Sequence, residues 1–469
     1  MTGLFGVAAK DCSKELFYGT DYHSHCAANW AGVALYVPSS ENPAEKIFRK
    51  SHQIGNVQFK AEFSDIRKLS GKYGLGVLSN ERQPICKKSK LGNIAVATDS
   101  TIFNLENILE KLFANGATLS EASFEQVNQT EVVSQLICQK SDIVDGLEYA
   151  VNSVDGFCSA LLLTENGIYV ARDRHGMNTL ILGKRDDGAF AVASETSAFP
   201  NLHFKIEKYL EPGEILYFNE NGYEVKKKGD NSNLRHCIFD WIYFSDPSGM
   251  HEGVNVEKVR NRCGAELAEM EPADFDADIA SGVPDSGTGH AVGYANKSGI
   301  PFGRPLIKYG PGWSKSYVPA TQERREEIAY YKIIPLPSLI EGMRLVIVDD
   351  SIRRGTQLRN LIHQKVLPYK PKEVHVRIAS PPQLFPCIRD KADVTRLATR
   401  RAIHAIEGKD IDDFSEYMDS NSEKYAKMVD YIRQEIGATT LSFITLDAMV
   451  RATGKPKDGH CLYCWTGKF

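Results

Sequence analysis

The sequence LVIVDDSIRRGT, residues 345–356, decides the fold of the second half of this chain. Residues 345–348 form a short apolar run, which predicts a buried strand of a parallel sheet. Asp349 and Asp350 come where that strand would end, and residues 358–362 have the pattern of a helix. A strand, a short polar loop and a helix in this order predict a ligand site at the carboxyl end of a parallel sheet.

The loop between this strand and helix contains residues that suit a phosphate group. Ser351 and Thr356 supply hydroxyl donors, and Gly355 lets the backbone approach a ligand closely. The two aspartates can hold sugar hydroxyls directly and a divalent cation through its water shell. The loop therefore predicts a phosphorylated sugar as the ligand.

Length and composition limit the class of protein. The chain has 469 residues, enough for two to three domains with separate cores. Its hydrophobic content of 42% and charged content of 25% are typical of a soluble globular protein, and its net charge of −4 argues against general affinity for nucleic acid. Because no apolar run is as long as a membrane span and the N-terminus lacks a signal pattern, we expect no membrane partner and a cytoplasmic location.

The two halves of the chain have different patterns. The first half has many short strand-like runs, with helical patterns at 102–114 and 130–140, which predicts stacked sheets flanked by helices. A polar run at 226–233 predicts a linker or turn. After it, strand-like and helix-like segments alternate, which predicts a parallel sheet with its ligand at the carboxyl strand ends.

Residues 345–356 resemble the signature of type I phosphoribosyltransferases, which bind phosphoribosyl pyrophosphate (PRPP). An ordinary Rossmann-like strand end is the alternative, but it does not require an acidic pair together with Ser, Arg, Gly and Thr. The whole chain resembles glutamine PRPP amidotransferase (amidophosphoribosyltransferase), the family that opens de novo purine synthesis. The segments that carry this resemblance are 3–7, 21–25, 31–32, 172–173, 176, 193–196, 211–214 and 464–467.

The resemblance implies an α/β and α+β architecture with two domains. Residues 1–232 would form an αββα sandwich like that of N-terminal-nucleophile (Ntn) hydrolases, and residues 233–469 a type I phosphoribosyltransferase domain with a parallel sheet and a cluster-binding C-terminus. In the family, ammonia released from glutamine in the first domain passes internally to PRPP in the second. The resemblance also implies a homo-oligomer, with a homotetramer favoured, and leaves purine nucleotides as candidate regulators.

The family's glutaminase nucleophile is an N-terminal cysteine, activated by its own α-amine. This chain begins Met1-Thr2-Gly3, so removal of the methionine would expose Thr2. An N-terminal threonine can act as such a nucleophile. Taken alone, Thr2 leaves glutamine hydrolysis open.

The residues that support the family's glutaminase chemistry are altered. Where the family has its carboxylate-gripping Arg, its oxyanion-hole Asn-Gly and its amine-holding Asp, this chain has GVLSN at 76–80, TDST at 98–101 and NQTE at 128–131. The His-Arg-Gly segment has become HCA at 25–27. Asp99 would repel a developing oxyanion. Because such groups act as a unit, their losses compound, and this domain is predicted to be inactive.

The phosphoribosyltransferase residues are largely retained. Residues 283–287 match the family's Val-Pro-Asp-Ser segment, whose serine contributes to the magnesium site. Mg²⁺ keeps several waters and uses few protein oxygens beside substrate phosphates, which suits a small ligand set. The resemblance implies PRPP binding by Asp349, Asp350, Ser351, Arg354, Gly355 and Thr356, and magnesium binding by Ser286, Asp349 and Asp350.

The family's mobile loop over PRPP matches less well. Lys308 and residues 321–326 are retained, but the interior of the loop, at 309–317, is rebuilt. Lys308 and Lys315 are the predicted catalytic cations, and Lys315 stands where the family has an arginine, so a bidentate grip would weaken to a point charge. A tolerated surface lid and a loop with altered catalysis or an altered amine acceptor are both open.

Four cysteines are candidate metal ligands. The C-x₂-C pair at Cys461 and Cys464 fits zinc ribbons, redox sites and clusters alike. In cluster-containing family members, cysteines at the places of Cys237, Cys387, Cys461 and Cys464 hold a [4Fe–4S] cluster, and four thiolates suit that cluster or a structural zinc. The resemblance favours a structural cluster. Six other cysteines show no ligand spacing and are expected to be buried small hydrophobes, namely Cys12, Cys26, Cys86, Cys138, Cys158 and Cys263.

The leading hypothesis is therefore a glycosyltransferase of the amidophosphoribosyltransferase type. It would bind Mg²⁺–PRPP, transfer ammonia or another amine to C1 and release pyrophosphate. Two alternatives stay open. One is a non-catalytic PRPP- or nucleotide-binding regulatory homologue, suggested by the rebuilt loop, and the other is a glutaminase that uses Thr2.

Overall fold

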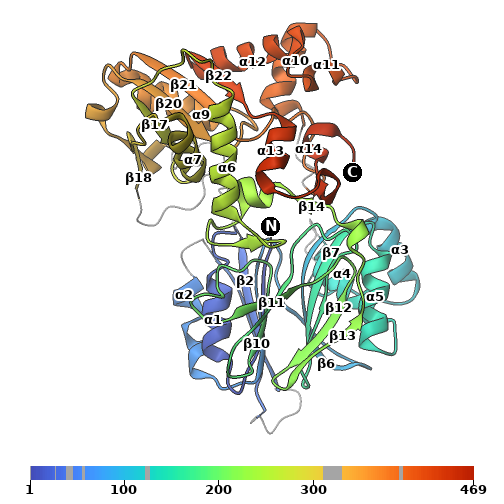
Figure 1. Cartoon of the computed structure of the whole chain (residues 1–469). Helices are drawn as coiled ribbons and strands as arrows, with labels where there is room; N and C mark the ends of the chain where they lie inside the picture. The colour runs from blue at the N-terminus through green and yellow to red at the C-terminus, as the bar shows by residue number, and fades with distance from the viewer. Residues whose placement is uncertain are drawn as a thin grey trace. The chain divides into compact units, whose positions relative to one another are not determined.

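A computed structural model describes residues 2–26, 28–38, 46–54, 59–121, 127–309, 330–389 and 394–469 (Figure 1). The chain divides into two compact units. The first unit comprises residues 1–237, 248–253 and 458–460, and the second comprises 238–247, 254–457 and 461–469. Within the described ranges, no helix is long and apolar enough to cross a membrane.

Two antiparallel sheets form the centre of the first unit. Their strand orders are β11-β9-β10-β1-β4-β2-β3 and β13-β12-β8-β7-β6-β5. The strands are β1 (Gly3–Ala8), β2 (Trp30–Tyr36), β3 (Ile47–Gln53), β4 (Tyr73–Ser79), β5 (Ile85–Ser89), β6 (Gly92–Ile102), β7 (Gly156–Leu163), β8 (Ile168–Ala171), β9 (Ile181–Lys184), β10 (Phe190–Ala193), β11 (Lys205–Tyr209), β12 (Ile215–Asn219) and β13 (Gly222–Lys227).

Helices cover the outer faces of both sheets in the first unit. Figure 1 shows α1 (Ser13–Asp21) and α2 (Phe59–Glu62) beside one sheet and α3 (Leu105–Ala114), α4 (Gln129–Cys138) and α5 (Ile143–Ser153) beside the other. Strand β1 explains the layering, because its side chains alternate between two faces. Leu4 and Ala8 pack between the sheets, whereas Phe5 and Val7 pack against the α1 side. The predicted αββα sandwich is confirmed.

A four-stranded parallel sheet forms the core of the second unit. Its strand order is β17-β20-β21-β22, and the strands are β17 (Ile279–Gly282), β20 (Arg344–Asp349), β21 (Glu373–Ile378) and β22 (Thr440–Phe443). The strand predicted at 345–348 is thus the centre of β20. Its side chains alternate, since Val346 and Val348 enter one core and Leu345 and Ile347 the other.

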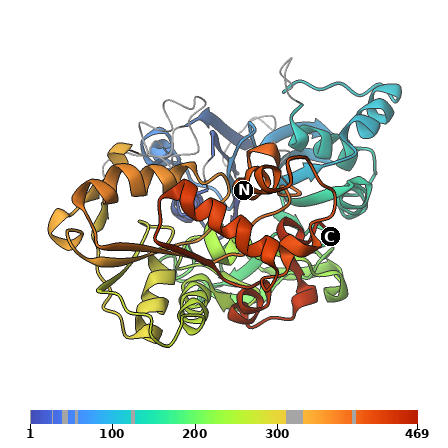
Figure 2. The same cartoon turned by 90° about the horizontal axis from the view of Figure 1, so that it is seen from above.

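Helices also cover both faces of the parallel sheet. One face packs against α6 (Val256–Glu269), α7 (Thr288–Ser298) and α13 (Leu446–Thr453), and the other against α9 (Thr356–Leu361), α10 (Ala398–Glu407) and α12 (Glu423–Ile436). Figure 2 shows the orange-red α12 running along the sheet. The remaining elements are β14 (His236–Cys237), β15 (Met250–His251), β16 (Val254–Asn255), β18 (Leu306–Lys308), β19 (Ile333–Pro335), α11 (Ser415–Met418), β23 (His460–Cys461) and α14 (Tyr463–Thr466).

Two local predictions were wrong. Lys226 and Lys227 belong to β13 rather than to a linker, because lysines are common on an exposed edge strand, and the loop starts only after them. Cys86 is exposed rather than buried, because it alternates outward on β5, which is also at a sheet edge. The helices predicted at 102–114 and 130–140 are confirmed as α3 and α4.

Candidate functional site

The end of β20 positions the acidic pair. Asp349 is the last residue of β20, and Asp350 begins the loop that leads to α9. Gly355 directly precedes α9 with φ of +76°, a left-handed conformation that favours glycine. The strand, loop and helix expected from residues 345–356 are therefore present.

The loop after β17 meets the end of β20. Ser286 Oγ donates a hydrogen bond to Asp349 Oδ1 at 2.7 Å, and the backbone N–H of Asp350 donates to the same oxygen at 3.0 Å. A Cβ atom on Gly287 would lie 2.0 Å from the carbonyl oxygen of Val348, so only glycine permits this approach. The structure thus brings together two segments that were identified separately in the sequence.

The acidic pair is electrostatically strained. Asp350 is only 5% exposed, and the Ser351 hydroxyl donates to its Oδ2 at 2.5 Å. Burial raises the pKa of both carboxyls, and the charge of Asp350 raises the pKa of Asp349 further. A divalent cation placed here would relieve that repulsion.

The positive charge of Arg260 opposes this repulsion. Sequence analysis did not identify Arg260 as part of the site. It is a buried residue of α6 whose Nε donates to the Trp241 carbonyl at 3.0 Å and whose Nη2 donates to the Ser245 carbonyl at 2.8 Å. Its positive charge lowers the pKa of Asp350, against the larger effect of burial. Arg260 therefore favours the ionised form that a cation or ribose hydroxyl needs.

Two further residues that sequence analysis missed, Arg401 and Ala398, hydrogen-bond to the 351–356 loop. Arg401 on α10 donates from Nη2 to the Arg354 carbonyl at 3.0 Å and pairs with Glu435 at 2.8 Å. The backbone N–H of Ala398 donates to the Arg353 carbonyl at 2.9 Å. No local pattern could have shown this, because Arg401 comes 47 residues after Arg354.

The predicted catalytic cations have different outcomes. Lys308 ends β18, and its ammonium pairs with Asp285 of the loop that also carries Ser286. Lys308 therefore contacts the loop whose Ser286 hydrogen-bonds to Asp349. Lys315 lies outside the residues that the structure describes.

The altered glutaminase positions of the first unit hydrogen-bond to one another and to neighbouring protein groups. The backbone N–H of Thr98 donates to Gln83 Oε1 at 2.8 Å, and the Thr98 and Thr130 hydroxyls are 2.7 Å apart. Asn128 caps α4 by accepting from the Glu131 N–H at 3.0 Å. These polar groups are thus paired within the first unit.

Acidic side chains lie beside these positions. Asp99 is 5% exposed and accepts a hydrogen bond from the amide of Asn178. Glu81 accepts from the Gln129 backbone N–H at 3.0 Å, and its pKa is raised, mainly by burial and also by the charge of Asp99. Thr2 is partly exposed and directly precedes β1. The first unit therefore has two interacting carboxyl groups, those of Glu81 and Asp99, beside these positions.

Comparisons with known proteins agree on one family. A model of a glutamine amidotransferase domain matches residues 74–201. The amidophosphoribosyltransferase of Methanothermobacter thermautotrophicus is 30% identical over 484 residues, which cover 100% of this chain and 94% of that protein. The chain belongs to the amidophosphoribosyltransferase family.

Other relatives agree over the full chain. The amidophosphoribosyltransferase of Bacillus subtilis is 29% identical over 480 residues, covering 100% of this chain and 93% of that protein. A solved structure of glutamine PRPP amidotransferase from B. subtilis, complexed with ADP and GMP, matches with a TM-score of 0.82 at 29% identity, covering 100% of this chain and 97% of that one. The predicted family and fold class are confirmed.

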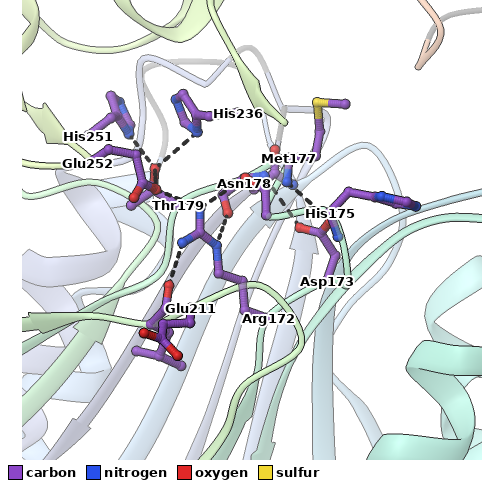
Figure 3. A network of polar contacts seen from close by, with 12 residues as sticks. Arg172, Asp173, His175, Met177, Asn178, Thr179, Glu211, His236, His251 and Glu252 are labelled. Carbon is purple, nitrogen blue, oxygen red and sulfur yellow. Dashed lines mark hydrogen bonds and ion pairs between the residues drawn. The ribbon is translucent and has the colours of Figure 1, made fainter. Parts of the chain in front are cut away.

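The first unit of this family member contains a buried polar network around Arg172 (Figure 3). Arg172 Nη2 donates to Glu252 at 2.6 Å, and the Thr179 hydroxyl lies 3.3 Å from His236 Nδ1 and 3.1 Å from His251 Nδ1. Burial lowers the pKa of His251 to about 4. The network fixes the segment that leads to Cys237, whose backbone N–H donates to the Met177 carbonyl at 3.2 Å.

The cysteines proposed as cluster ligands in this amidophosphoribosyltransferase homologue are mostly buried. Cys237, Cys461 and Cys464 are 8%, 8% and 9% exposed, and Cys387 is half-buried. Burial raises the pKa of the Cys461 thiol to about 11, with a smaller contribution from Cys387. Burial therefore disfavours the thiolate form of Cys461.

Proposed function

We propose that this amidophosphoribosyltransferase homologue binds Mg²⁺–PRPP in the second unit and transfers ammonia or another amine to C1 of the ribose, with release of pyrophosphate. The observation that carries the proposal is the hydrogen bond from Ser286 to Asp349. It joins the proposed metal-binding serine to the proposed ribose-binding aspartate at the carboxyl ends of β17 and β20. Such an edge of a parallel sheet is the usual place for a ligand.

Each part of PRPP has a proposed partner. Asp349 and Asp350 would hold the ribose hydroxyls, and the 351–356 loop would hold the 5-phosphate. Ser286 and Lys308 would face the pyrophosphate. Ser286, Asp349 and Asp350 offer the oxygen ligands that Mg²⁺ prefers, and the ion would neutralise charge on the departing pyrophosphate.

The reaction requires little covalent chemistry from the protein. The nitrogen lone pair of the amine forms a bond to C1, the bond from C1 to the pyrophosphate oxygen breaks, and pyrophosphate leaves with that electron pair. An amine proton is then lost to solvent. Positioning and charge neutralisation are therefore the main tasks of the binding residues.

The first unit is proposed to have lost glutaminase activity. The polar network of Gln83, Thr98 and Thr130 and the acidic side chains of Glu81 and Asp99 support this proposal. Ammonia or another amine would then come from solution. The assignment of residues 1–232 to the inactive glutaminase-like domain and of 233–469 to the transferase domain is part of the same proposal.

We propose that the four cysteines hold a structural [4Fe–4S] cluster, supported by the burial of Cys237, Cys461 and Cys464. Iron and acid-labile sulfide content, compared between the protein and Cys464→Ser, tests this assignment. A homotetramer and regulation by purine nucleotides are proposed from the family, and the B. subtilis structure complexed with ADP and GMP supports the second. Molecular mass in solution and inhibition by these nucleotides test them.

The deciding experiment measures pyrophosphate release from PRPP with Mg²⁺ and ammonium. We expect release with ammonium, its loss in Asp350→Asn, and wild-type behaviour in Asp430→Asn, an exposed aspartate of α12 that serves as the control. Glutamine should not replace ammonium. Tight PRPP binding without pyrophosphate release from any amine would instead support the non-catalytic alternative. Glutamate release that disappears in Thr2→Ala would support the glutaminase alternative.

A further inference from the structure

A thiol, an imidazole and a carboxylate meet in the first unit, away from the phosphoribosyltransferase residues. Cys26 Sγ lies 3.6 Å from His25 Nε2, and the same nitrogen lies 3.1 Å from Glu195 Oε2. Glu195 comes 170 residues after His25, so the fold, not the local sequence, creates this cluster. The Cys26 environment therefore differs from the plain burial expected from sequence.

The hydrogen bonds fix the protonation of His25. Its Nδ1 lies 3.1 Å from the Tyr22 carbonyl, and its Nε2 faces Glu195 Oε2. Because a carbonyl and a carboxylate only accept, both ring nitrogens must carry hydrogen. His25 is thus an imidazolium, consistent with a pKa raised well above the usual value by the charge of Glu195 despite burial.

Glu195 is held in its ionised form. Its side chain is 3% exposed, its Oε1 accepts from the Ser197 hydroxyl at 2.6 Å, and its Oε2 accepts from His25. The positive charge and hydrogen bond of His25 hold the pKa of Glu195 well below its usual range, against the cost of burial. The other imidazoles near Glu195, His23 and His251, remain neutral because burial lowers their pKa.

The cluster has an open hydrogen-bonding position for a ligand. His23 is fully buried, and its Nδ1 lies 2.8 Å from the Gly19 carbonyl. Its Nε2 has no hydrogen-bond partner among the described residues, although His23 interacts electrostatically with both Glu195 and His25. A bare imidazole nitrogen at this place can accept a hydrogen bond from a small polar molecule.

The cluster lies at the N-terminal end of β1. The backbone N–H of Leu4 donates to Ser194 Oγ at 3.1 Å, directly before Glu195. A Cβ on Gly3 would lie 2.4 Å from Cβ of His23, so β1 begins against the cluster. The thiol is therefore close in the fold to the strand that Thr2 precedes.

We propose that Cys26, His25 and Glu195 form a nucleophilic thiol site whose substrates are small disulfides. A thiol beside an imidazolium that a carboxylate holds in place is a usual arrangement of a reactive cysteine. The Cys26 thiolate attacks one sulfur of the disulfide, a new S–S bond forms, and the original S–S bond breaks. The second sulfur leaves as a thiolate with the electron pair and takes a proton from solvent, so Cys26 is oxidised and the leaving sulfur is reduced.

The other cysteines provide the comparison within one molecule. Cys12, Cys158 and Cys263 are at most 2% exposed, and burial raises the pKa of each thiol. Cys86 is exposed but has no imidazole among its hydrogen-bond partners in the described part of the chain. If exposure alone set reactivity, Cys86 would react before Cys26, which is 5% exposed.

The test uses the full-length protein, bis(2-hydroxyethyl) disulfide as the neutral probe, and mass mapping of all cysteines over time. Cys26 should form the mixed disulfide about tenfold faster than Cys86, although Cys86 is the more exposed residue and burial raises the pKa of its thiol to about 11. Glu195→Gln should slow Cys26 about tenfold and leave Cys86 unchanged. The matched control is Glu214→Gln, which removes an equally buried carboxylate paired with Lys208 and should change neither rate.

Faster modification of Cys86 than of Cys26, or an unchanged Cys26 rate in Glu195→Gln, overturns the proposal. A second measurement needs no change at Glu195. In His25→Gln, which removes the imidazolium, Cys26 should also react about tenfold more slowly, and an unchanged rate also overturns the proposal. Pyrophosphate release should persist in Cys26→Ser, so this inference and the transferase proposal fail separately.

Discussion

Asp349 and Asp350 are adjacent; Asp350 is buried and Asp349 is partly buried. Burial raises the pKa of both carboxyls and the charge of Asp350 raises that of Asp349 further, while Ser286, Ser351 and Arg260 favour the charged forms. Ionisation of both carboxyls is therefore unfavourable without a cation, and a bound divalent cation would make it favourable. This is the residue-scale reason to expect tight coupling between Mg²⁺, pH and stability.

This coupling gives a prediction of stability against pH. A carboxyl with a raised pKa in the folded state favours folding when protonated, so that contribution is lost as pH rises through the raised folded pKa. Without Mg²⁺, thermal stability should therefore fall as pH rises through this range. With Mg²⁺ the loss should be reversed, and the stabilisation by Mg²⁺ should shrink as pH falls.

Thermal melting across pH, with and without Mg²⁺, measures this effect. Asp350→Asn should remove most of the Mg²⁺-dependent shift, because one charge and the repulsion both disappear. Asp430→Asn is again the control, since its carboxylate is exposed and paired with Arg433. An equal Mg²⁺ shift in Asp350→Asn would contradict the assignment of the acidic pair.

At the scale of elements, residues of α10 and α12 hold the 351–356 loop in position. Arg401 of α10 donates to the Arg354 carbonyl and is held by Glu435 of α12. The loop also contains Gly355, which adopts a left-handed conformation. Glycine has access to more backbone conformations than other residues, so the isolated loop would be less restricted. External contacts therefore restrict a loop whose own sequence leaves it flexible.

Arg401→Gln should weaken this support without removing any proposed ligand of PRPP. We expect the KM for PRPP to rise about tenfold with a smaller change in kcat, because the loop must be ordered on binding. Steady-state pyrophosphate release measures both constants. The control is Arg433→Gln, an arginine of the same unit that pairs with Asp430. A fall in kcat with unchanged KM would assign Arg401 a different role.

How far the sequence predicts these elements depends on the range of the contacts. The apolar run and acidic pair of β20 are local signals, and the strand, loop and helix followed from them. Arg260, Arg401 and Glu195 act across long sequence separations, so no local pattern marked them. Lys226 and Cys86 were misplaced because edge strands tolerate the polar, exposed residues that also mark loops.

At the scale of the whole molecule, both units keep the packing of the family fold, whereas their proposed sites differ in how many family residues they retain. The αββα sandwich requires alternating apolar residues such as Leu4 and Phe5, which serve packing and not catalysis. Its glutaminase positions can therefore change while its layers persist. The parallel sheet of the second unit retains both its apolar strands and its polar strand ends.

This contrast predicts which ligand each unit recognises. A ligand stabilises the state that binds it, by about 2.7 kcal/mol at a concentration one hundred times its Kd. Amide hydrogen exchange should therefore slow in β17, β20 and the 350–355 loop when Mg²⁺–PRPP is added. Glutamine at millimolar concentration should leave exchange unchanged at residues 98–101 and 128–131, because protein groups already fill those hydrogen-bonding positions.

Asp350→Asn provides the control for the exchange experiment, since it should remove the PRPP effect in the second unit and leave exchange in β6 and α4 unchanged. Protection of residues 98–101 or 128–131 by glutamine would contradict the loss of the glutaminase site. Protection by PRPP in the Asp350→Asn protein would place the PRPP site elsewhere. PRPP and glutamine report on separate units. The experiment therefore tests PRPP binding by the second unit and glutamine binding by the first unit independently.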